Sequence, residues 1–98
     1  MADQVLQPIE QKQVLLYDDE LTSVRAANGD VYVSIPQMCS SLGLDTQAQR
    51  RRMERHEIME EGIGVAKLAT PGGQQDTYVL RVDLIPLWLS GVRVSAVR

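Results

Sequence analysis

Four arginines lie within six consecutive residues and form the one unusual concentration of charge in the chain. They are Arg50, Arg51, Arg52 and Arg55, and His56 follows them directly. On a helix, Arg51 lies one turn from Arg55, and like charges at that spacing cost about a few tenths of a kcal/mol. These five residues are therefore the candidate macromolecule-binding site, for phosphates or for an acidic protein surface. The alternative is a solvated helix whose arginines lie over apolar neighbours.

The other side chains offer no set of groups for catalysis or metal binding. Acid–base and nucleophilic catalysis need converging groups, and a zinc site needs several Cys and His ligands. The chain has one histidine, His56, and one cysteine, Cys39. Instead of a Cys39–His56 thiolate pair we expect a buried thiol and an exposed imidazole, and we expect the acidic run at 18–20 to be solvated. We therefore predict no enzyme activity, no cofactor and no metal.

Composition and charge predict one small domain inside a cell. The chain has 98 residues, 44% of them apolar, and a formal net charge of −3, which is ordinary for a globular domain. Residues 1–30 carry six carboxylates against two cations, whereas residues 46–56 carry four arginines against one carboxylate. Such segregated charge can guide a partner. The lone cysteine, the lack of a signal core and the lack of a long apolar run predict a cytoplasmic location and no membrane contact.

The first half of the chain predicts strands followed by the two helices that position the arginines. Residues 1–11 are polar and aperiodic and predict a flexible leader, and residues 13–17 predict a first strand. Asn28-Gly29 lies between β-rich runs at 21–26 and 31–35, which indicates a hairpin with a type I′ turn. Ser34 then caps a helix that has Pro36 in its first turn and ends at Gly43. Asp45 caps a second, mostly exposed helix over residues 46–56.

The second half predicts another hairpin and a buried third helix. Residues 63–70 and 77–82 are strands joined by the turn Pro71-Gly72-Gly73. Asp83 caps a helix over 84–89, which ends at Gly91 and is apolar almost all round. The predicted structural core is Leu42, Leu84, Leu87 and Trp88. The order predicts an α+β fold of small antiparallel β-hairpins packed with two to three short helices.

An ordered set of motifs over about residues 12–98 resembles the amino-terminal domain of phage antirepressors. The motifs are Asn28-Gly29-Asp30-Val31-Tyr32-Val33, Pro36-Gln37-Met38-Cys39, Leu42-Gly43-Leu44-Asp45, the basic run 50–55, Thr70-Pro71-Gly72-Gly73-Gln74 and Leu84-Ile85-Pro86-Leu87-Trp88-Leu89-Ser90-Gly91-Val92. The last segment carries most of the resemblance. The chain departs from the pattern at Thr46, where an aromatic residue near the Asp45 cap is expected.

The resemblance implies a regulatory module that acts by contact and has no catalytic motif. Such antirepressors inactivate a phage repressor protein by direct contact, and most carry a helical, oligomerising carboxy-terminal part. Residues 12–92 would then be the antirepressor-type domain, and 93–98 the start of a downstream segment. The related BRO amino-terminal domains are associated with DNA binding, so the alternative is a DNA-binding regulatory domain that uses the arginine-rich helix. Exposed strand edges leave a homo-oligomer as a further option.

Overall fold

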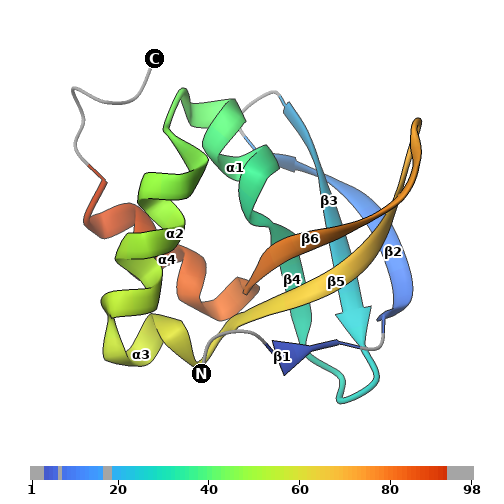
Figure 1. Ribbon diagram of the computed structural model, residues 1–98, viewed down its shortest axis with the longest axis horizontal. Helices are drawn as coiled ribbons and strands as arrows, with labels where there is room; N and C mark the ends of the chain where they lie inside the picture. Colours follow the sequence, from blue (N-terminus) through green and yellow to red (C-terminus); the bar gives the residue numbers. More distant parts are fainter. Residues whose placement is uncertain (1–3, 7, 17–18, 93–98) are drawn as a thin grey trace.

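A curled six-stranded sheet carries the helices on one of its faces (Figure 1). The computed structural model describes residues 4–6, 8–16 and 19–92. The strands are β1 (Gln4–Val5), β2 (Pro8–Leu16), β3 (Asp19–Ala26), β4 (Val31–Ser34), β5 (Ile63–Thr70) and β6 (Gly73–Arg81). The helices are α1 (Ile35–Leu42), α2 (Thr46–Arg55), α3 (Glu57–Glu60), the 3-10 turn η1 (Val82–Leu84) and α4 (Ile85–Ser90). The predicted α+β class is confirmed.

The sheet is built from the two hairpins that the sequence predicts. The strand order is β1-β5-β6-β4-β3-β2; β1 pairs with β5 in parallel, and the other neighbours pair antiparallel. The hairpins β3–β4 and β5–β6 meet where β4 pairs with β6. Strand β2 lies at the edge of the sheet, and the self-association expected from an exposed edge stays a prediction.

The turn between β3 and β4 differs from the predicted type I′ turn. The N–H of Gly29 donates to the Ala26 carbonyl (2.9 Å), and the N–H of Ala26 donates to the Asp30 carbonyl (2.8 Å). These bonds enclose a three-residue loop, in which Gly29 adopts a φ of 92°. A type I turn followed by a left-handed glycine joins antiparallel strands in this way.

The caps predicted for α1 and α2 are confirmed. Ser34 Oγ accepts from the N–H of Gln37 (3.3 Å), and Gly43 ends α1 with a φ of 73°. Asp45 Oδ2 accepts from the N–H of Ala48 at the start of α2 (2.8 Å). Side-chain oxygens at these positions satisfy backbone N–H groups that have no partner within the helix.

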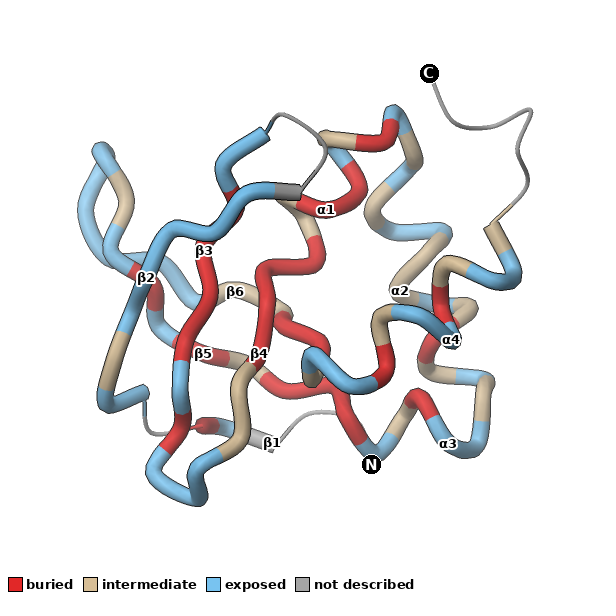
Figure 2. Tube along the Cα trace, turned by 180° about the vertical axis from the view of Figure 1, so that it is seen from behind, coloured by how far each residue is buried: buried red, intermediate tan, exposed pale blue. Residues whose placement is uncertain are grey.

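Both faces of the sheet bury apolar side chains. Figure 2 shows buried residues along the strands and on the helices. The helix-side cluster is formed by Leu21, Val33, Ile35, Met38, Cys39, Leu42, Met53, Met59, Ile63, Leu80, Leu84 and Trp88. The second cluster, formed by Leu6, Val24, Ala26, Tyr32, Ala66, Leu68 and Val79, gathers residues of β3, β4, β5 and β6 together with Leu6, which follows β1. The curl of the sheet therefore buries a second core without a second layer of helices.

The side chain of Gln11 links the two sides of the curled sheet. Gln11 of β2 donates from Nε2 to the Ala69 carbonyl (3.1 Å) and accepts at Oε1 from the Ala69 N–H (3.0 Å). The Gln11 side-chain amide thus pairs with the backbone of Ala69 in the way that a peptide group of a neighbouring strand would. This contact draws the edge strand toward β5 and supports the curl around the second cluster.

Three further sequence predictions about the fold are wrong. Residues 4–5 and 8–11, which the sequence predicts as a leader, lie in β1 and β2; an exposed edge strand shows no apolar alternation, so its pattern gives no signal. Asp83 pairs with Arg81 (2.6 Å) instead of capping the last helix, and this ion pair lowers the pKa of Asp83. Leu87 is 36% exposed because the short helix α4 buries one side, where Trp88 lies. Tyr17, which ends the first predicted strand, and residues 93–98 lie outside the described residues.

Trp88→Ala should lower the free energy of unfolding by about 3–5 kcal/mol, because Trp88 is fully buried. Leu87→Ala is the matched control on the same helix and should cost about 1 kcal/mol or less, as an exposed position does. Urea denaturation followed by circular dichroism measures both changes. Equal losses in the two variants would contradict the placement of Trp88 in the core.

Candidate functional site on helix α2

The inward side of α2 is held against α4 by hydrogen bonds that converge on Trp88. Gln49 Oε1 accepts from Trp88 Nε1 (2.9 Å) and from Arg52 Nη1 (3.0 Å). Arg52 Nη2 also donates to the Trp88 carbonyl (3.1 Å). Met53, which is fully buried, lies on the same side of the helix. Arg52 therefore acts as a link between two helices and has little freedom to bind a partner.

Arg50 fixes α2 to the sheet. Its Nη1 lies 2.8 Å from Glu54 Oε2, and its guanidinium lies 4.5 Å from the centre of the Tyr78 ring in β6. A cation over an aromatic face is attracted by the negative potential of the ring. The Arg50 side chain is 23% exposed. Its charge is already matched within the domain.

Arg51 and Arg55 point away from the domain. Both are exposed, they lie one helical turn apart, and neither makes a hydrogen bond or ion pair with another described residue. Gln47, one turn before Arg51, is exposed on the same side. We call Gln47, Arg51 and Arg55 the outer face of α2. It exposes two neighbouring guanidinium groups to solvent.

His56 has a structural role at the junction of two helices. Its Nδ1 accepts from the N–H groups of Ile58 (3.2 Å) and Met59 (3.3 Å) and so caps α3, which the sequence did not predict. The side chain is half-buried, so the expected exposed imidazole is wrong. Of the five predicted site residues, the structure leaves Arg51 and Arg55 at the surface and uses Arg50, Arg52 and His56 within the fold.

A helical projection centred on Met53 would have separated these arginines. Successive residues turn by about 100° around the helix, so Arg51 and Arg55 fall on the side opposite Met53. Gln49 and Arg50 fall beside Met53, next to the packed face. The sequence alone does not show that Met53 is buried. Its burial follows from the packing of α2 against the rest of the domain.

Cys39 and His56 do not form a reactive pair. Cys39 is fully buried in the helix-side cluster, and burial raises the pKa of its thiol to about 11, opposed by a hydrogen bond with Thr46. The thiol thus stays protonated at neutral pH, and a protonated thiol is a poor nucleophile. In the described part of the chain, no group of three or more His, Cys, Asp or Glu side chains could hold a metal ion. The described helices are also too short to cross a membrane.

The chain forms a small α+β domain in which the outer face of α2 exposes two arginines. The family described as P22_AR N-terminal domain matches residues 12–98. The chain therefore belongs to this antirepressor amino-terminal domain family, and the resemblance found in the sequence is confirmed. No curated protein and no solved structure matches the chain. Family membership supports an antirepressor-type regulatory role in a phage system.

Arg52→Ala should destabilise the domain by about 1–2 kcal/mol, because it removes a half-buried, charged donor from the Trp88 carbonyl and from Gln49. Arg51→Ala deletes the same side chain one residue earlier and should change stability by no more than about 0.5 kcal/mol. Thermal melting of the two variants separates a structural arginine from a free one. A larger loss in Arg51→Ala would contradict the assignment.

Proposed function

We propose that this domain relieves transcriptional repression by binding a phage repressor protein through the outer face of α2. The observation that carries the proposal is the pair Arg51 and Arg55, exposed and without a partner among the described residues. Membership in an antirepressor domain family supports the regulatory role. The domain acts by contact alone, without catalysis, in the cytoplasm of the bacterial host.

The chemistry of the outer face favours an acidic protein surface as its target. Guanidinium groups bind carboxylates through two parallel hydrogen bonds, and two of them one turn apart can engage carboxylates on neighbouring positions of a partner. Charges at the rim of an interface mainly accelerate association and select the partner. The domain's net charge of −3 makes this cationic face a local feature, which orients an approaching partner.

The double variant Arg51→Glu/Arg55→Glu should weaken the release of operator DNA from the repressor by about tenfold or more, because it reverses both charges of the contact. The assay is fluorescence anisotropy of labelled operator bound to the repressor encoded by the same phage genome, titrated with this chain. Lys12→Glu/Lys67→Glu is the control, since both lysines are exposed on strands and the change in net charge is the same.

Two results would contradict the proposal. If the wild-type chain neither binds the repressor nor releases the operator, repressor binding is wrong. If the wild type releases it and both double variants do so equally well, the contact lies elsewhere than on the outer face of α2.

DNA binding is the second candidate, favoured by the same two arginines. Exposed guanidinium groups can contact successive phosphates, and the affinity then depends on the release of counterions. The negative net charge and the carboxylates Glu57 and Glu61, which follow α2, oppose binding to a polyanion. DNA binding would therefore depend on the outer face of α2 and not on the charge of the whole domain.

Two phosphate contacts predict a slope of about −1.8 for the logarithm of affinity against the logarithm of salt concentration. Titration of random duplex DNA at several low salt concentrations measures this slope. Arg51→Glu/Arg55→Glu should abolish the binding, whereas Lys12→Glu/Lys67→Glu should retain it. The absence of wild-type binding at the lowest salt would exclude the DNA candidate and leave the repressor proposal intact.

A further inference from the structure

A groove with an almost entirely apolar lining opens on the helix-side face of β2, β3 and β4. It has a volume of about 240 Å³ and lies where α1, η1 and α4 leave this face uncovered. Its lining consists of Val14, Leu15, Leu21, Ser23, Val31, Val33, Met38, Val82 and Ile85. Leu15 is 76% exposed and Val82 45% exposed. Apolar side chains gathered at a surface in this way mark an interaction site.

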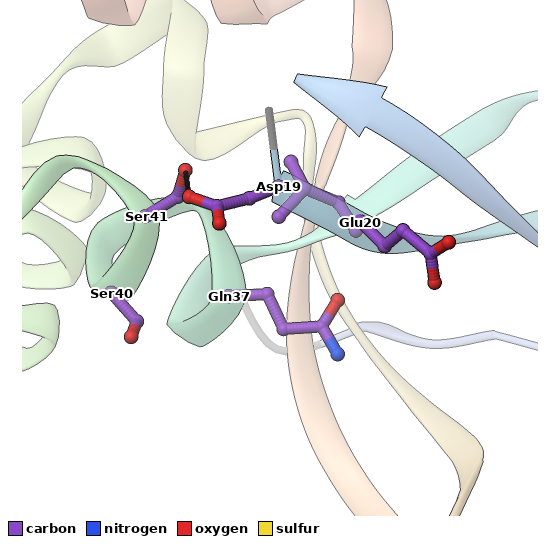
Figure 3. A pocket seen from close by; sticks show the side chains of 6 residues that line it. Asp19, Glu20, Gln37, Ser40 and Ser41 are labelled. Carbon is purple, nitrogen blue, oxygen red and sulfur yellow. Dashed lines mark hydrogen bonds between the residues drawn. The ribbon is translucent and has the colours of Figure 1, made fainter. Parts of the chain in front are cut away.

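This groove shares the lining residue Leu21 with an acidic hollow of about 200 Å³. Asp19, Glu20, Gln37, Ser40 and Ser41 line the hollow together with Leu21. Figure 3 shows the side chains of Asp19 and Ser41 meeting between β3 and α1, where Ser41 Oγ donates to Asp19 Oδ2 (2.6 Å). Within the described residues, no lysine or arginine forms an ion pair with Asp19 or Glu20.

The charges near the other end of the groove are matched within the domain. Arg25, which pairs in register with Val31, forms an ion pair with Glu10 (3.1 Å). Arg81, next to Val82, forms one with Asp83 (2.6 Å). The groove therefore has a neutral end and an end with unmatched negative charge, which favours an occupant that carries a cation on one side.

We propose that this groove docks an amphipathic, cationic helix of a partner protein. Apolar side chains of the helix enter the groove, and a lysine or arginine reaches the carboxylate of Asp19 or that of Glu20, which point in opposite directions (Figure 3). This site uses no residue of α2, so it is separate from the outer face of α2 and from the function proposed for it.

The lining favours a helix as the occupant. The groove lies on a sheet face, where the backbone groups of β3 pair with those of β2 and β4, and Ser23 is its single polar lining residue. A segment bound on this face, and not along the outer edge of β2, must therefore satisfy its own backbone N–H and carbonyl groups, as a helix does. The groove is also smaller than the roughly 300–1,000 Å³ typical of a small-molecule site, which suits one or two anchoring side chains.

The experiment uses two synthetic helical peptides with the same leucine stripe, one flanked by lysines and the other by glutamates. Methyl-labelled wild-type chain is titrated with each peptide and followed by NMR. The lysine peptide should bind and shift the methyl signals of Val14, Leu21, Val33 and Ile85. The glutamate peptide should bind about tenfold more weakly or not at all.

Leu15→Lys/Val82→Lys should weaken binding of the lysine peptide by about tenfold or more, because it places cations in the groove. Ile9→Lys/Ile58→Lys is the matched control: both residues are exposed isoleucines outside the groove, the added charge is equal, and binding should persist. Equal affinity for the two peptides, equal affinity of the two double variants, or methyl shifts confined to other surfaces would each overturn the proposal. All four substitutions are at exposed positions, and a melting curve checks that each variant folds.

Discussion

The contact between Trp88 and the inward side of α2 is the constraint on which the surface of this domain depends. Gln49 and Arg52 bind the indole and the carbonyl of Trp88, and these bonds set the rotation of α2 about its own axis. That rotation turns Arg50 toward Tyr78 and leaves Arg51 and Arg55 in solvent. Of the four arginines of α2, two are therefore exposed at the surface, because Arg50 and Arg52 hold the helix in place.

The curled sheet explains how so short a chain builds two apolar clusters. A domain of this size buries a modest share of its surface, and it has four aromatic residues with which to do so. The curl lets the second face of the sheet enclose its own side chains, with Gln11 joining β2 to β5. The helices are then needed on one face alone. Because they are short, they leave part of that face open, and this opening is the apolar groove.

The domain thus carries two surfaces of opposite character. The outer face of α2 is cationic and polar, whereas the groove is apolar with an acidic end. Cys39 is buried and His56 is a helix cap, so neither the thiol nor the imidazole is placed for chemistry. The two proposed contact surfaces are consistent with the regulatory role of the domain's antirepressor family.

The sequence by itself determined the features that arise from local chemistry. Asn28-Gly29 placed the first hairpin, Ser34 and Asp45 began the helices, and the motif around Trp88 carried the resemblance to the family. These features depend on residues close together in the chain, where conformational preferences and caps act directly.

Tertiary structure decided the features that depend on distant partners. The polar first half of edge strand β2 is fixed by its pairing with β3, Asp83 turns from the helix to Arg81, and Leu87 is exposed because α4 buries the side that carries Trp88. The division of the arginines has the same origin, since Trp88 lies 36 residues beyond Arg52. A charged side chain has the same local preferences whether it faces water or a carbonyl, so only packing could assign its role.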